Sequence, residues 1–236
     1  SNKNTAEWDF DILANNFDED MLKDVGFDLS TFPEPEILHL DNEDDVPEVK
    51  KTDIKLGDMF QLGEHRLLCG DATKKEDVEK LMHGEKADMI FTDPPYNVNY
   101  GISKNPRHKI RKIKNDNLNL EQWKEFCIKL FNNFKIFANG DIYMWGADAP
   151  DGMRMRLWLI EMGAHWSTTI IWKKQQLILT PANYQRIYES CFYGWFDKSS
   201  FVGDRKQIEV WEIDRPLKSD LHPTMKPIEL CEKGIL

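Results

Sequence analysis

Short apolar runs of strand length recur along the chain from about residue 53 onward, separated by segments with helical spacing. Because such runs are bounded by Gly, Pro, Asn or Asp, they predict buried β-strands. The four clearest runs are Met89 to Phe91, Asp141 to Trp145, Trp166 to Trp172 and Ile187 to Trp195. A further pair of short runs, Met59 to Leu62 and Arg66 to Cys69, flanks a turn at Gly63-Glu64 and predicts a hairpin.

Helical periodicity fills the gaps between these strands. Asn119 precedes a segment with apolar side chains at spacings of three and four, which predicts a helix that ends at Asn139-Gly140 and packs its aromatic stripe on the sheet. Another helix is expected from about Asp151 to before Gly163, and a capping box at Thr73 to Glu76 predicts one through about His83. Strands that alternate with helices and finish in a hairpin-like pair predict a doubly wound α/β sheet of Rossmann-like type.

Composition adds limits to this picture. With 236 residues, of which 41% are hydrophobic, the chain can bury one sizeable core. No apolar run approaches the roughly 20 residues of a membrane span, and no secretory leader is recognisable, so a cytoplasmic protein is expected. The four cysteines lie far apart with no nearby histidine pair, which favours free thiols over disulfides or a metal site.

The net charge of -10 is divided unevenly along the chain. Residues 1–50 contain three lysines and fifteen acidic residues, so their charge is −12 and that of the remainder is +2. We therefore divide the chain into an acidic extension, residues 1–50, and a catalytic domain, residues 51–236. Within the extension, the aromatic residues of 7–29 predict a short helix ending at Gly26, and the prolines and acids of 30–50 predict an extended linker.

The first chemical motif follows the strand at Met89 to Phe91 directly. Asp93, Pro94, Pro95 and Tyr96 form a stiff turn in which two backbone N–H donors are missing, so the turn offers hydrogen-bond acceptors. In open α/β sheets chemistry lies just past the carboxyl ends of strands, where Asp93 is expected. A surface turn without function is the alternative, since Asp and Pro are ordinary turn residues.

A carboxylate, a free carbonyl and an aromatic ring together suit an exocyclic amino group on a flat heterocycle. The lone pair of adenine's 6-amino group is delocalised into the ring, and the group becomes nucleophilic when acceptors hold its two hydrogens. Asp93 and the Pro94 carbonyl could hold them, and the Tyr96 ring could stack on the base, a contact of roughly 1–3 kcal/mol. The base would first have to be flipped out of its duplex.

These residues resemble the catalytic motif of amino-group DNA methyltransferases that use S-adenosylmethionine, in the aspartate form usual for adenine methylases. The order of segments resembles the β class of that family. The resemblance implies double-stranded DNA as partner, S-adenosylmethionine as cofactor, no metal and, by analogy, a homodimer. The segment at residues 7–29 also resembles the connector to a ParB-like domain in some phage and prophage proteins, which implies a further upstream domain.

A second motif, residues 222–230, resembles the segment that precedes the cofactor-binding strand of β-class methylases and lines the methionine end of the cofactor. Thr224 can cap the helix that Pro227 begins, and Lys226 can reach an anionic carboxylate. Asp71, in a Gly-Asp pair before the first helix, could border the cofactor pocket, although a turn at a helix start explains it nearly as well. The candidate cofactor ligands are Asp71, His222, Pro223, Thr224, Lys226 and Pro227.

Basic residues cluster next to the candidate base pocket, where either DNA-backbone contacts or an ordinary solvated loop would explain them. A second basic loop joins the last two strands, and in the family this loop comes near the DNA. The candidate DNA-binding residues are Lys104, Arg107, Lys109, Arg111, Lys112, Lys114, Lys173, Lys174 and Arg186. Residues 196–220 fall where the family places its target-recognition region.

The resemblance stops before the Phe-x-Gly-x-Gly strand that binds the cofactor in the family, because no such motif occurs in these residues. We therefore expect a C-terminally incomplete sheet that binds S-adenosylmethionine weakly and is nearly inactive by itself. Adenine methylation is the leading expectation. Cytosine 4-amino methylation and a non-catalytic DNA-binding module remain the alternatives.

Overall fold

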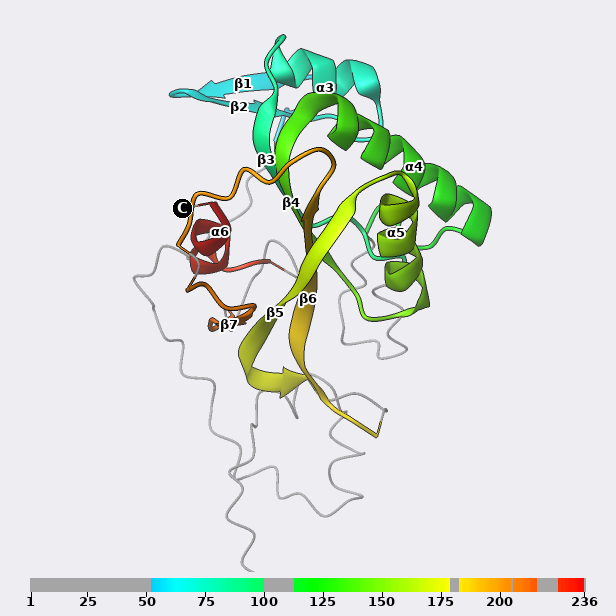
Figure 1. Cartoon of the computed structure of the whole chain (residues 1–236). Coiled ribbons are helices and arrows are strands. Elements are labelled where there is room, and N and C mark those ends of the chain that lie inside the picture. Colours follow the sequence, from blue (N-terminus) through cyan, green and yellow to red (C-terminus); the bar gives the residue numbers. More distant parts are fainter. Residues whose placement is uncertain (1–51, 100–112, 179–182, 205, 216–224, 236) are drawn as a thin grey trace, which may run out of the picture.

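The computed structural model describes residues 52–99, 113–178, 183–204, 206–215 and 225–235. A mixed five-stranded sheet with the order β3-β4-β6-β5-β7 forms its centre, and the hairpin β1-β2 forms a separate sheet (Figure 1). The strands are β1 (Met59–Leu62), β2 (His65–Leu68), β3 (Ala87–Thr92), β4 (Ala138–Gly146), β5 (His165–Ile178), β6 (Arg186–Trp195) and β7 (Val210–Glu212). The helices are α3 (Lys75–Met82), α4 (Leu120–Phe137), α5 (Pro150–Glu161) and α6 (Ile228–Ile235).

Strand directions in the sheet are mixed. β3 and β4 are parallel, with Phe91 opposite Tyr143, and α4 makes the crossover between them. β6 runs antiparallel to both of its neighbours, β4 and β5, and β7 pairs in parallel with β5. The carboxyl ends of β3 and β4 therefore meet at one edge of the sheet, where β6 is near its amino end.

Helices cover both faces of this sheet, which confirms the expected α/β architecture. Side chains of β4 alternate between the faces: Ile142 and Met144 belong to a core with α4 and α5, whereas Tyr143 and Trp145 belong to a core with Leu230 of α6. In Figure 1, α4 and α5 lie on one side of the strands and α6 lies on the other. The site described below lies on the α6 face.

Helix α4 follows its predicted pattern closely. The Asn119 side chain accepts a hydrogen bond from the Gln122 backbone N–H, and the Gln122 side chain accepts one from Asn119, so a reciprocal capping box begins the helix. Its periodic apolar positions face the sheet and are buried, as expected for a core stripe. They include Trp123, Cys127, Leu130, Phe131 and Phe134.

Two predictions about helix ends are wrong. Thr73 and Glu76 form no capping box, because the Thr73 hydroxyl donates to Asp71 Oδ1 at 2.7 Å and the N-cap of α3 is Lys74 without a side-chain cap. The residues Asn139-Gly140 do not terminate α4 but lie inside β4. Gly140 is needed there because a Cβ atom would come within 1.7 Å of the Asp88 carbonyl oxygen on β3.

The predicted helix at residues 7–29 and the linker at 30–50 lie outside the described residues. The segment 196–220, predicted to recognise the target, contains β7, whose Trp211 is buried in the core on the α6 face. Among the helices that the structure describes, none has the length and apolar character needed to cross a bilayer.

Candidate active site

Asp93 is the first residue after β3, at the edge of the sheet where the sequence predicted it. Pro94 is buried and Pro95 is half-buried, so the turn is held against the protein body. The Tyr96 hydroxyl folds back and donates a hydrogen bond of 2.5 Å to Asp93 Oδ1. The four-residue motif is therefore a closed turn whose carboxylate and phenol are joined.

Lys226 reaches this turn from the far end of the chain. It lies in the segment just before α6, whose first turn is packed down by the buried Pro227. Its Nζ lies 2.9 Å from Asp93 Oδ2 and 3.2 Å from the Tyr96 hydroxyl oxygen. The carboxylate that the sequence led us to expect for Lys226 is thus one of the chain's own.

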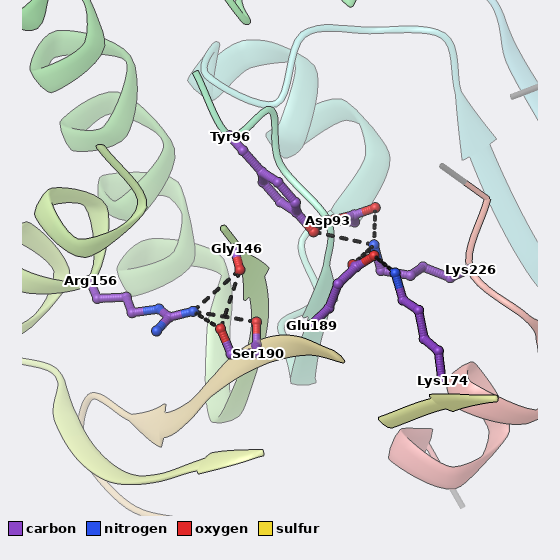
Figure 2. A network of polar contacts seen from close by, with 8 residues as sticks. All are labelled: Asp93, Tyr96, Gly146, Arg156, Lys174, Glu189, Ser190 and Lys226. Carbon is purple, nitrogen blue, oxygen red and sulfur yellow. Dashed lines mark hydrogen bonds and ion pairs between the residues drawn. The ribbon is translucent and has the colours of Figure 1, made fainter. Parts of the chain in front are cut away.

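Glu189 of β6 is the second carboxylate at Lys226, with its Oε2 2.9 Å from Nζ. Its Oε1 pairs with Lys174 Nζ of β5 at 2.5 Å. We call Asp93, Tyr96, Lys174, Glu189 and Lys226 the ion network, and Figure 2 shows their side chains converging. Exposed side-chain fractions are only 5% for Lys174, 8% for Lys226, 23% for Glu189 and 32% for Asp93.

Aromatic rings surround the Lys226 ammonium group. Its Nζ lies 5.7 Å from the ring centre of Tyr96, 5.8 Å from that of Trp145 and 6.0 Å from that of Trp172. Rings at such distances attract a cation through their electron-rich faces. β4 and β5 contribute the two tryptophans, so the sheet itself forms much of the wall around the charge.

The pKa shifts describe a network of paired charges around a neutral phenol. Burial raises the pKa of Tyr96 well above its usual value, and the charges of Asp93 and Glu189 raise it further. Burial alone would lower the pKa of Lys226, but Asp93 and Glu189 outweigh it and raise that pKa. Burial would raise the pKa of Glu189, but the ammonium groups of Lys226 and Lys174 lower it overall. For Lys174, burial lowers the pKa although Glu189 opposes the shift.

Asn97 fixes the chain as it leaves the turn. Its φ of 56° lies in the left-handed region, which Asn tolerates better than most residues. Its Nδ2 donates to the Leu118 carbonyl at 3.0 Å and to Asp151 Oδ2 at 2.7 Å, and its Oδ1 accepts from the Leu118 N–H at 2.7 Å. These bonds tie the turn to the segment just before α4 and to the first turn of α5.

Ser190, next to Glu189, is held from the opposite face of β6 (Figure 2). Its hydroxyl accepts a hydrogen bond of 2.5 Å from Arg156 Nη2 and donates one of 2.6 Å to Asp148 Oδ1. Arg156 Nη1 also pairs with Asp148 at 3.2 Å. The strand position that carries Glu189 is therefore anchored through α5.

Asp71 lies at the start of α3 and is engaged locally. Its Oδ1 accepts hydrogen bonds from the Thr73 N–H and hydroxyl, and its own N–H donates to Asp77 Oδ2 at 2.8 Å. The hydrogen bond from the Thr73 side chain is the main cause of its lowered pKa, to which the Lys114 charge contributes. These contacts are those of a helix-start turn, and a cofactor role for Asp71 stays a prediction.

The predicted DNA-binding residues fall into three situations. Lys114 and Arg186 are exposed, and Lys173 pairs with Glu212 at 2.8 Å on the surface. Lys174 is instead buried against Glu189, so its ammonium group does not face DNA in this structure. The remaining basic candidates, and three of the cofactor candidates, lie outside the described residues; they are Lys104, Arg107, Lys109, Arg111, Lys112, His222, Pro223 and Thr224.

Glu189 was missed by the sequence analysis, although it carried a signal. Beyond Arg186 at its start, β6 has no other charged residue, and a lone charge in a strand otherwise rich in apolar side chains requires a partner. Within the part of the chain that the structure describes, no group of three or more His, Cys, Asp or Glu residues could hold a metal ion.

A cavity of 490 Å³ lies on the same face of the sheet but away from the ion network. Met89, Tyr143, Tyr193 and Trp211 are among its lining residues, together with the last turn of α6, whereas no member of the ion network lines it. Half of its lining residues lie between Ser200 and Trp211, and those from β4 and β5 lie in the first half of each strand, whereas Asp93 follows the end of β3. We therefore place the candidate chemistry at the turn and not in this cavity.

No family model matches the chain, and no curated protein sequence matches it. Among solved structures it is similar to the M1.HpyAVI-SAM complex, with 21% identity and a TM-score of 0.45 over 70% of this chain and 71% of that one. It is also similar to M1.HpyAVI, with 18% identity and a TM-score of 0.46 over the same shares. Similarity at this level carries no argument about activity.

Proposed function

We propose that the chain is the catalytic part of a DNA methyltransferase that transfers a methyl group from S-adenosylmethionine to the 6-amino group of a flipped adenine. The observation that supports this most directly is the placement of Asp93. Its carboxylate leaves the end of a parallel strand on a turn with two prolines, where it can accept hydrogen bonds.

The acceptor capacity of the turn matches an amino group. A carboxylate has about four lone-pair sites, and Tyr96 and Lys226 each take one. Two sites on Asp93 therefore remain for the hydrogens of a substrate amino group, and the Pro94 carbonyl can supply a further acceptor. When these acceptors hold the amino hydrogens, the nitrogen lone pair is directed out of the base ring and becomes nucleophilic.

The chain's own residues also control charge during such a reaction. Methylation places positive charge on the amino nitrogen as S-adenosylhomocysteine leaves, and the Asp93 carboxylate stabilises this charge until an amino proton passes to solvent. Lys226, only 8% exposed, pairs with this carboxylate before substrate binds. Tyr96 remains protonated because its pKa is raised, so its hydroxyl orients Asp93 and its ring is the candidate surface for stacking on the base.

S-adenosylmethionine, when bound, supplies the activated methyl group. The Lys226 ammonium group is engaged by Asp93, Glu189 and Tyr96, so it can lie beside the methionine end of the cofactor without pairing with the carboxylate there. We propose that Lys226 and Pro227, with the segment before them, line that end. DNA contacts are assigned to Lys114, Lys173 and Arg186, and DNA binding through them should weaken as salt concentration rises.

The test compares Asp93→Asn with Asp88→Asn in the full-length protein. Both variants replace a carboxylate by an amide on β3 or directly after it, but Asp88 is exposed and outside the ion network. Transfer of a tritiated methyl group from S-adenosylmethionine to duplex DNA should fall by about 10²-fold or more in Asp93→Asn and stay near wild type in Asp88→Asn.

Nucleoside analysis of the methylated DNA completes this test. N6-methyladenine is the expected product, whereas N4-methylcytosine would move the assignment to the cytosine amino group. Asp93→Asn transferring methyl groups at the wild-type rate would refute the catalytic role of Asp93. DNA binding without any methyl transfer by the wild-type protein would favour a non-catalytic DNA-binding module.

A further inference from the structure

Glu189 and the candidate catalytic carboxylate both pair with the Lys226 ammonium group. Nζ lies 2.9 Å from Asp93 Oδ2 and 2.9 Å from Glu189 Oε2. Nζ donates hydrogen bonds to Asp93 Oδ2 and, at 3.2 Å, to the Tyr96 hydroxyl oxygen, and it forms an ion pair with Glu189.

The four charged side chains of the ion network comprise two carboxylates and two ammonium groups, so their charges cancel. They alternate in space as Asp93, Lys226, Glu189 and Lys174, and each neighbouring pair is in contact (Figure 2). Since both lysines are almost wholly buried, neither can recover its hydration if an anion is removed. The negative charge on Glu189 therefore determines how strongly the Lys226 ammonium group interacts with the Asp93 carboxylate.

We propose that Glu189 is a positioning residue of the methyltransferase site, acting through Lys226. Its negative charge, 2.9 Å from Nζ, holds the ammonium group between two carboxylates, so that Asp93 keeps its remaining lone pairs open to the substrate amino group. This inference rests on the proposed function of Asp93. Lys174 completes the arrangement by neutralising the other Glu189 oxygen.

The backbone is built to hold Glu189 in this place. The neighbouring Ser190 is fixed on the other face of β6 by Arg156 and Asp148, and the strand is paired on both sides, with β4 and β5. A carboxylate that served only to neutralise Lys174 would need just one of its oxygens. Glu189 uses both, and the second contacts the same ammonium group as Asp93.

The primary test is Glu189→Gln, which keeps the shape of the side chain and removes its charge. The turnover number for methyl transfer should fall by roughly tenfold or more, while KM for DNA changes little. The reason is that Asp93 is then the only carboxylate that pairs with Lys226. Glu125→Gln is the matched control. Glu125 also pairs with a lysine, Lys129 of α4 at 2.7 Å, but it lies on the exposed surface outside the ion network, and its variant should keep wild-type turnover.

A double variant, Glu189→Gln with Lys174→Met, separates positioning from stability. It removes one positive and one negative charge, so no unpaired Lys174 is left to unfold the protein. If Glu189 positions Lys226, the double variant folds and its turnover remains reduced. Recovery of wild-type turnover in the double variant would overturn the inference, because Glu189 would then serve only to neutralise Lys174.

A measurement independent of activity is the ionisation of Lys226, followed by NMR of ¹⁵N-labelled lysine side chains. The pKa of Lys226 should be lower in Glu189→Gln than in wild type, since a neighbouring anion is lost. An unchanged pKa would overturn the inference. Absence of methyl transfer in the wild-type protein would instead overturn the proposed function, so the two failures are distinguishable.

Discussion

Replacing Asn97 by alanine should loosen the candidate active-site turn from the helices behind it. Asn97 directly follows Tyr96, and its side chain makes three hydrogen bonds: two with the Leu118 backbone and one with the Asp151 carboxylate. Alanine can make none of them. The change also places alanine at a φ of 56°, where side chains other than Asn, Asp and Gly are disfavoured.

The magnitude follows from the kind of each bond. A neutral hydrogen bond contributes about 1 kcal/mol and a bond to a charged group about 2 kcal/mol, so the three together amount to about 4 kcal/mol. Asn97 is only partly buried, so water replaces part of this and about 3 kcal/mol remains. The backbone strain adds about 1 kcal/mol to the total cost.

The assay is equilibrium unfolding in urea, with Asn99→Ala as the matched control. Asn99 has the same φ of 56°, and its backbone N–H donates to the Asp116 carbonyl, a bond that alanine retains. Subtracting the two losses in unfolding free energy removes the strain and leaves the side-chain bonds, about 3 kcal/mol. A difference below about 1 kcal/mol would refute the conclusion that Asn97 fixes the turn.

Three further predictions concern strand packing, thiol reactivity and pH. Gly140→Ala should lower the free energy of unfolding by several kcal/mol, on the order of 3 or more, because the new Cβ would lie 1.7 Å from a β3 carbonyl oxygen; thermal denaturation measures the loss. In native protein a thiol-specific reagent should modify Cys69 before Cys127 or Cys191, since burial raises the pKa of Cys127 to about 12 and that of Cys191 as well. Mass spectrometry of timed samples measures the order, and earlier reaction of the buried pair would contradict it. Because the pKa of Glu189 is lowered from 4.5, its ionised form stabilises the fold above that pH. The difference in unfolding free energy between wild type and Glu189→Gln, measured by urea titration, should therefore shrink below about pH 4.5. A difference that stays constant down to about pH 3 would contradict the pairing.

The helices and most strands could be predicted because their signals are local. Helix α4 shows the spacing of three and four along its buried face, and its capping residues stand next to it in sequence. β7 was missed because it has three residues, of which only Trp211 is buried, so no alternation is visible. The antiparallel pairing of β5 with β6 agrees with the predicted hairpin-like pair, but the position of β6 between β4 and β5 was beyond the pattern, since burial alone does not report strand order.

The candidate site could be predicted only for residues that lie close together in the sequence. Asp93 and Tyr96 adjoin in sequence and meet as expected, whereas Lys226 meets Asp93 across 133 positions through the packing of α6. Lys174 illustrates how alternation within a strand decides a residue's environment. Lys173 faces the surface and Lys174 faces the core, although both are lysines of one basic loop in the sequence.

The attachment of α6 makes the charge state of the site depend on a local opening equilibrium. Of its eight residues only Leu230 is buried, so releasing this helix from the sheet exposes little apolar surface compared with global unfolding. Each release would carry Lys226 away and leave two carboxylates facing each other without their shared cation. Backbone amides of α6 should therefore exchange with solvent faster than those of β4. A molecule that binds α6 in its docked position would also stabilise the state in which Lys226 pairs with Asp93 and Glu189.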